Sequence, residues 1–185
     1  KIKSKKIDIF ILKKNLGVGG ATKYGIKKSL KYKPNQIIKM DGDGQHDPKY
    51  LNTFIKSQKK NPQSYLKGYR NLLSRNTPKI RLIGNFFITS IIRFITKNYN
   101  LKDVVNGFIS IPNYVIKIIN LKKLSNNFFF EQDLINQISL KKINIIEIKI
   151  STIYNKKIES SLNEFKVILP FSLKYIKIFF SRLKI

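Results

Sequence analysis

Apolar runs and amphipathic stretches alternate along the first half of the chain. Residues 6–12 and 37–40 are short, apolar and rich in isoleucine, which predicts two strands. Between them, residues 21–32 predict a helix that follows a glycine-rich turn. A single apolar stripe over residues 51–61 predicts a second helix, and residues 65–70 predict a strand that ends on a basic residue. This half is therefore expected to contain three strands separated by two helices.

The second half continues the alternation with broader apolar faces. Residues 79–98 predict a helix whose wide apolar face either packs in the core or lies in a membrane interface. Residues 128–134 open another helix, and residues 143–150 alternate apolar and polar side chains as a half-buried strand does. Residues 165–185 mix aromatic and basic side chains, which is typical of a segment that packs on the core or rests on anionic lipid. Strands that alternate with helices predict an α/β fold.

The composition narrows the classes of partner. A chain of 185 residues with 42% hydrophobic residues fits one globular domain, and the absence of cysteine excludes disulfides and thiolate metal sites. The net charge of +27 indicates affinity for nucleotide phosphates, anionic lipid head groups or nucleic acid, although no motif supports specific nucleic-acid recognition. No apolar run approaches the ~20 residues that a membrane-spanning helix needs. We therefore expect a protein of the cytoplasm, or one bound peripherally to the cytoplasmic face of a membrane.

An acidic loop follows the second predicted strand. After Met40 the chain reads Asp41-Gly42-Asp43-Gly44-Gln45-His46-Asp47-Pro48, in which Asp47 and Pro48 fit the N-cap and first position of a helix. A strand end, an acidic turn and a helix start is the arrangement in which open α/β sheets bind ligands. Asp41 and Asp43 can direct oxygens at one hard cation, Mg²⁺ or Mn²⁺, whose other ligands come from water and phosphates.

The alternative for this loop is that its Asp and Gly residues only form a turn. Three of the ten acidic residues and the single histidine of a strongly basic chain fall within it. That concentration favours a metal–phosphate site.

The segment from Met40 to Pro48 resembles the metal-binding segment of family 2 glycosyltransferases. The similarity is greatest to the branch that includes dolichol-phosphate mannose synthase and other polyprenyl-phosphate glycosyltransferases. The resemblance implies a GT-A fold, a Rossmann-like α/β domain with a mixed, mainly parallel sheet flanked by helices. It also implies that Asp41, Asp43 and Gln45 bind Mg²⁺ or Mn²⁺, that Asp41 contributes to donor binding, and that Asp43 is catalytic.

Other pieces of the family pattern imply a donor site. The family's Asn- and Gly-containing segment before the first helix helps to shape the nucleotide-sugar pocket, although a plain strand–helix turn is the alternative here. Two arginines resemble those that contact donor or lipid phosphate, and a guanidinium suits phosphate because its donors form a planar fork. The donor-binding residues implied in this way are Asn15, Gly17, Gly19, Lys23, Arg70 and Arg81.

The acceptor side is less sharply marked. Asp103 begins a segment that resembles the family's Asp-x-x-x-Gly-Phe, and it either orients an acceptor or serves as a turn residue. Glu131 and Asp133 stand where the family has an acidic residue facing the acceptor, although acidic residues in a first helical turn also complement the helix dipole. Such a carboxylate is a general base toward a hydroxyl acceptor, whereas a lipid phosphate is already an anion and needs no base. The lysines expected to contact acceptor phosphate are Lys156 and Lys157.

The resemblance covers essentially the whole chain but lacks the family's first strand and its Asp-Asp-Gly-Ser segment, so we expect a fragment or a truncated gene product, N-terminally incomplete. Residues 1–160 are interpreted as the partial catalytic domain and residues 161–185 as a basic amphipathic segment. The implied reaction is an inverting transfer from a UDP- or GDP-linked sugar to a dolichyl or undecaprenyl phosphate at an anionic membrane surface.

Two alternatives to this reaction remain. One is transfer to a saccharide hydroxyl in cell-surface polysaccharide synthesis. The other is a non-catalytic basic domain that binds anionic membrane or nucleic acid by charge alone.

Overall fold

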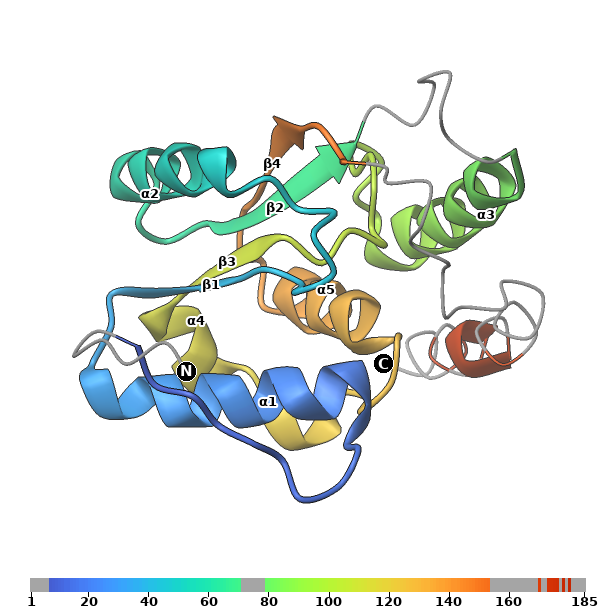
Figure 1. Ribbon diagram of the computed structural model, residues 1–185. Helices are drawn as coiled ribbons and strands as arrows, with labels where there is room; N and C mark the ends of the chain where they lie inside the picture. Colours follow the sequence, from blue (N-terminus) through green and yellow to red (C-terminus); the bar gives the residue numbers. More distant parts are fainter. Residues whose placement is uncertain are drawn as a thin grey trace.

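The computed structural model describes residues 7–70 and 79–153, together with residues 170, 173–176, 178 and 180. In these residues helices and strands alternate up to α4, which α5 follows without an intervening strand, and the strands form a four-stranded sheet with helices on both faces (Figure 1). Single turns of 3-10 helix lie in the connections, at Leu30–Tyr32, Pro48–Tyr50 and Leu121–Lys123. The longer elements are α1 (Gly17–Ser29), β1 (Gln36–Lys39), α2 (Leu51–Lys60), β2 (Tyr65–Arg70), α3 (Lys79–Thr96), β3 (Ile109–Pro112), α4 (Asn113–Ile118), α5 (Phe130–Leu140) and β4 (Ile145–Ile150).

The sheet has the strand order β1-β3-β2-β4. β3 pairs antiparallel with both β1 and β2, and only β2 and β4 form a parallel pair. The prediction of a mainly parallel sheet is therefore wrong. Since β1 and β2 both run against β3, they point in the same direction as each other and as β4. The strand β3, which was not predicted, lies between β1 and β2 and runs in the opposite direction to both, so both of its pairings are antiparallel.

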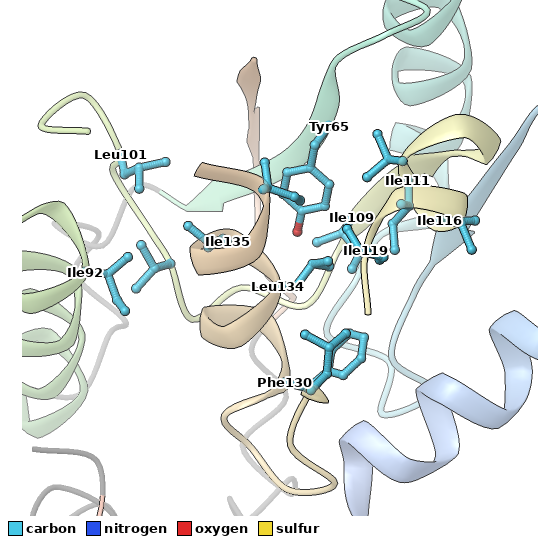
Figure 2. Packing of buried hydrophobic residues seen from close by; sticks show 14 of the residues in the cluster. Tyr65, Ile92, Leu101, Ile109, Ile111, Ile116, Ile119, Phe130, Leu134 and Ile135 are labelled. Carbon is cyan, nitrogen blue, oxygen red and sulfur yellow. The ribbon is translucent and has the colours of Figure 1, made fainter. Parts of the chain in front are cut away.

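Hydrophobic cores lie on both faces of the sheet. On one face, α1, α3, α4 and α5 pack against side chains that include Tyr65 of β2 and Ile109 of β3. Figure 2 shows these side chains beside Leu134 of α5, which has no exposed surface. On the other face, Phe54 of α2 stacks on Phe108, with ring centroids 4.4 Å apart. Full burial of each such side chain stabilises the fold by roughly 1.5–3 kcal/mol, so the helices fix the sheet from both sides.

Residues 7–12 do not form the predicted strand. They have no regular secondary structure, and Ile7, Ile9 and Ile11 are half to almost fully exposed. A β-branched apolar sequence becomes a strand only where a neighbouring strand supplies hydrogen bonds, and within the described residues this segment pairs with none. Phe10 instead meets Tyr24 of α1 edge-on, with ring centroids 6.1 Å apart.

α3 presents a broad apolar surface to solvent. Ile92 and Ile95 face the core, whereas four large apolar side chains on the helix remain 41–71% exposed: Ile83, Phe86, Phe87 and Phe94. Leu173 and Ile176, in the short helical stretch near the end of the chain, are also more than half exposed. Among the described helices, none combines the length and the hydrophobicity that crossing a bilayer requires.

Candidate active site

The acidic loop begins directly after β1 and is held in shape by its own hydrogen bonds. The Asp41 backbone N–H donates to His46 Nδ1 at 3.1 Å, and the Gln45 N–H donates to Asp43 Oδ1 at 2.9 Å. Gly44 adopts a φ of 76°, which permits the tight turn between them. Asp47 caps the following helical turn by accepting from the backbone N–H of Lys49, which confirms the predicted helix start. The loop is thus a defined turn that leads from β1 into α2.

His46 fastens this loop to the sheet. Its ring is buried, lies 5.2 Å from the Phe108 ring between centroids, and its backbone forms an isolated bridge with Thr152 just beyond β4. Burial is the main cause that lowers the pKa of His46 below its usual value. Since Nδ1 accepts the hydrogen bond from Asp41, the neutral ring carries its proton on Nε2. His46 therefore serves here as a structural anchor of the acidic loop.

Lys39 joins the acidic loop to α5. Its Nζ lies 2.7 Å from Asp41 Oδ1, 2.9 Å from Glu131 Oε1 and 3.3 Å from the Gly107 carbonyl oxygen. The Lys39 and Glu131 side chains are only 13% and 6% exposed, whereas Asp41 is 37% exposed. Burial opposes the charge on Lys39, but the nearby Glu131 and Asp41 outweigh it and raise the pKa of Lys39 above its usual value. The structure thus brings two of the predicted acidic residues into one ion-paired cluster.

Gly107 makes room for this cluster. A Cβ at this position would lie 2.6 Å from Asp41 Oδ2 and 2.6 Å from Lys39 Nζ. Both distances are too short for real atoms, so a side chain at residue 107 would displace Asp41 or Lys39. The Asp-x-x-x-Gly-Phe segment therefore supplies a cradle for Asp41, a role that the sequence reasoning did not anticipate.

Asp41, Asp43 and Gln45 are the residues that could hold a hard divalent cation. Asp41 uses Oδ1 toward Lys39 and is partly open to solvent, and Asp43 and Gln45 lie in the same exposed turn. The Lys39 ammonium already places a positive charge against Asp41. Within the part of the chain that the structure describes, no three His, Asp or Glu side chains gather as an all-protein metal site. A site with two carboxylates matches an ion that takes its remaining ligands from phosphates and water.

Arg70 and Asp103 are bound to each other. At the end of β2, Arg70 Nε donates to Asp103 Oδ2 at 2.7 Å and Nη2 donates to Oδ1 at 3.1 Å. Asn85 of α3 adds a donor at 2.9 Å, and Asp103 has no exposed surface. Burial alone would raise the pKa of Asp103, but Arg70 outweighs it and holds that pKa below the usual value. Asp103 is therefore buried and holds the Arg70 guanidinium in place.

Glu131 and Asp133 have different surroundings despite lying in one helical turn. Glu131 faces the Lys39 cluster, whereas Asp133 accepts hydrogen bonds from the Ser125 hydroxyl at 2.6 Å and from the Tyr175 hydroxyl at 3.1 Å. Lys174 also lies 2.5 Å from Asp133. Asp133 is thus the attachment point of the short helical stretch near the chain end, and Glu131 is the carboxylate that shares a cluster with Asp41.

The glycine-rich start of α1 packs against residues 125–127. Gly19 lies so close to the Ser125 carbonyl that no side chain fits, and the Gly20 N–H donates to the Asn126 carbonyl at 2.9 Å. Gly17 has a φ of 72° and is equally close to Asn126. Two other predicted donor residues serve the same packing. Asn15 Oδ1 accepts from Gly17 N at 2.8 Å, and Lys23 Nζ donates to the Leu124 carbonyl at 2.7 Å. The four predicted donor residues Asn15, Gly17, Gly19 and Lys23 thus lie in α1 or just before its start, and the last three contact residues 124–127.

Three predicted residues are not placed in detail. Arg81 lies in the first turns of α3, but its side chain is outside the described residues. Lys156 and Lys157 also lie outside them.

The sequence reasoning missed several charged residues around the cluster. Lys67 of β2 has no exposed surface, donates to the Asn106 carbonyl at 2.5 Å, and has a pKa lowered to about 8, mainly by burial. Glu147 of β4 accepts from the backbone N–H of Lys102 at 2.8 Å. Lys39 and Lys67 both stand opposite Ile109 in the sheet, so both side chains emerge on the α5 face. In the sequence, the only sign of these two buried lysines was the presence of a lysine within an otherwise apolar strand, β1 for Lys39 and β2 for Lys67.

The chain is distantly similar to one archaeal glycosyltransferase and to one uncharacterised archaeal protein, and no protein-family model matches it. It is 27% identical over 145 residues to a UDP-N-acetylglucosamine–dolichyl-phosphate N-acetylglucosaminyltransferase of Methanococcus voltae, which covers 77% of this chain and 57% of that protein. It is 30% identical over 145 residues, 77% of this chain, to an uncharacterised protein of Methanocaldococcus jannaschii, of which it covers 59%. The chain thus spans less than three fifths of the length of either relative.

Proposed function

We propose that this chain belongs to a metal-dependent glycosyltransferase that moves a sugar from a nucleotide-sugar donor to a polyprenyl phosphate. The observation that carries the proposal is the cluster in which Lys39 holds Asp41 and Glu131 together beside the acidic turn. A donor site needs carboxylates for a cation at the end of a strand, and an acceptor site needs a polar group next to it. The named relative supports UDP-N-acetylglucosamine as donor and dolichyl phosphate as acceptor.

The acidic loop forms the donor end of the proposed site. Asp41, Asp43 and Gln45 hold Mg²⁺ or Mn²⁺, and the ion supplies charge neutralisation for the diphosphate of the leaving nucleotide. Arg70, which Asp103 fixes in place, contacts a donor or lipid phosphate in this proposal, because a guanidinium suits phosphate recognition. By resemblance to the family, the displacement inverts the anomeric carbon.

Glu131 forms the acceptor end of the proposed site. A phosphate acceptor arrives already ionised, so Glu131 has no proton to remove and serves as a polar group that Lys39 holds beside the acidic turn. A hydroxyl acceptor would instead require Glu131 as general base. The identity of the acceptor thus decides the role of this one carboxylate.

A membrane surface suits the exposed apolar face of α3. Phe86 and Ile83 are 71% and 66% exposed, and the chain as a whole carries a net charge of +27. Apolar side chains that insert into the head-group region, together with basic residues that attract anionic lipid, hold a protein at a bilayer without crossing it. That placement would bring the active site to a lipid-borne phosphate.

A transfer assay tests this proposal. The chain is incubated with Mn²⁺, radiolabelled UDP-N-acetylglucosamine and vesicles that contain dolichyl phosphate, and the lipid fraction is then extracted and counted. We expect label in the lipid only when both Mn²⁺ and dolichyl phosphate are present, and no label from Asp41→Asn. A different result would support the alternative of a non-catalytic basic domain that binds by charge alone. In that result the chain binds the vesicles equally well with and without dolichyl phosphate, and no label enters the lipid.

A further inference from the structure

The Lys39 ammonium is completely satisfied within the cluster. An ammonium has three N–H donors, and three acceptors surround this one: Asp41 Oδ1, Glu131 Oε1 and the Gly107 carbonyl oxygen. The three acceptors come from β1's end, α5 and the segment before β3, so Lys39 joins parts of the chain that are up to 92 residues apart. Such a group has a fixed position and cannot swing away as a surface lysine does.

Both oxygens of Asp41 have neighbours within the fold. Oδ1 is bound to Lys39, and Oδ2 lies next to Gly107 and 4.0 Å from His46 Nδ1. The Asp41 side chain as a whole is still 37% exposed, so the carboxylate is partly accessible to a ligand. The positive charge of Lys39 also cancels part of the negative charge that Asp41, Asp43 and Glu131 would otherwise direct at a cation.

We propose that Lys39 is a positioning residue that sets the affinity of the Asp41–Asp43 site for its divalent cation and keeps Glu131 in place beside it. This inference rests on the proposed metal site. An internal cation that competes with the metal weakens metal binding in the absence of donor, so tight binding requires the additional phosphate ligands of the nucleotide-sugar. Lys39 thus couples metal binding to donor binding.

The inference predicts that loss of Lys39 raises the affinity for Mn²⁺, whereas simple structural damage would lower it. Replacing Lys39 by methionine removes the competing charge but keeps the length of the side chain. Mn²⁺ affinity without donor should then rise, by about tenfold at the interaction strengths typical of partly exposed sites. Damage to the loop would lower the affinity instead.

Variants of Glu131 provide a second, independent test, which depends on the net charge of the cluster. Glu131→Gln removes one negative charge and should weaken Mn²⁺ binding, whereas Lys39→Met combined with Glu131→Gln restores the net charge and should return the affinity close to that of the wild type. Removing both members of a buried ion pair is also tolerated better than removing one, so the double variant remains informative if Lys39→Met alone fails to fold.

The experiment measures free Mn²⁺ by electron paramagnetic resonance during titration of the chain, first without and then with UDP-N-acetylglucosamine. Lys49→Met is the matched control, because it removes the same charge from a lysine ten residues further along the chain, whose side chain is 64% exposed and pairs with Asp47. Lys49→Met should bind Mn²⁺ about as the wild type does.

Each outcome has a distinct meaning. Tighter donor-free binding in Lys39→Met, with a smaller gain on adding donor, supports the inference. Unchanged or weaker binding in Lys39→Met, while the wild type binds Mn²⁺, contradicts the role of Lys39 alone. A wild-type chain that binds no Mn²⁺ even with donor contradicts the proposed function, and the role of Lys39 with it.

Discussion

The ammonium of Lys39 lies 2.9 Å from the carboxylate of Glu131, although 92 residues separate them in the chain. Lys39 also lies 2.7 Å from Asp41, so a single side chain connects the acidic turn after β1 with the first turn of α5. A glycosyltransferase must hold donor and acceptor next to each other. In this chain the residues that we propose for the two substrates share one ion-paired centre.

Gly107→Ala should weaken metal-dependent donor binding while the fold is retained. The added methyl would lie 2.6 Å from Asp41 Oδ2 and from Lys39 Nζ, so Asp41, Lys39 or both must move. Gly25→Ala in α1 is the matched control, because a Cβ there meets no atom within 4 Å and alanine is the better helix former. Calorimetric titration of UDP-N-acetylglucosamine with Mn²⁺ should show weakened binding only in Gly107→Ala. Equal donor affinities in the two variants would contradict the conclusion that Gly107 makes room for Asp41.

Asp103→Asn should destabilise the fold by about 3 kcal/mol, because it leaves the Arg70 guanidinium without its buried counter-charge. Asp8→Asn is the control, since Asp8 pairs with Lys31 at 3.1 Å at the surface, where the side chains are about half exposed. Loss of such an exposed pair changes stability by less than about 1 kcal/mol. Urea unfolding of the two variants measures both values, and similar values would show that the Arg70–Asp103 pair contributes little.

The stability difference between wild type and Asp103→Asn should depend on pH. In the folded chain the pKa of Asp103 is held below its ordinary value of 3.8, so its ionised form favours folding. That contribution is fully present above pH 3.8 and is lost as the pH falls through the lower folded pKa. Unfolding free energies measured at several pH values between neutrality and strong acid should therefore converge at the acid end. If the difference in unfolding free energy between wild type and Asp103→Asn instead grew as the pH fell, the result would contradict a lowered pKa for Asp103.

Tyr175→Ala should release the short helical stretch near the chain end and cost about 3–5 kcal/mol, as removal of a buried aromatic ring does. Tyr175 has no exposed surface, and its hydroxyl donates to Asp133. Leu173→Ala, two residues earlier and 54% exposed, should change stability little. Urea unfolding followed by circular dichroism compares them. If the two variants have the same stability, the contact between Tyr175 and Asp133 does not stabilise the fold.

Local signals in the sequence were sufficient for several elements. Asp47 and Pro48 begin the helical turn before α2, and the strands predicted over 65–70 and 143–150 are present as β2 and β4. These features depend on neighbouring residues: a capping side chain, a fixed proline φ, and a period of two. The acidic loop was recognised for the same reason, since its whole pattern lies within nine residues.

Long-range relationships were not available in the same way. β3 has only four residues and its place between β1 and β2 depends on contacts across the fold, so the mainly parallel sheet was predicted in error. Residues 7–12 have the composition of a strand but no partner among the described residues, and their apolar side chains stay exposed. The Lys39 cluster joins positions 39, 41, 107 and 131, which no single stretch of sequence displays.

The most direct test of the proposed donor site is calorimetric titration of UDP-N-acetylglucosamine into the chain, with and without Mn²⁺. Asp43→Asn is compared with Asp47→Asn, which removes a charge from the same loop but keeps a good helix cap. We predict metal-dependent binding in the wild type and in Asp47→Asn, and at least a tenfold loss in Asp43→Asn, because an amide is a weaker ligand for Mn²⁺ than a carboxylate. Binding that is the same in all three proteins and independent of Mn²⁺ would contradict the account.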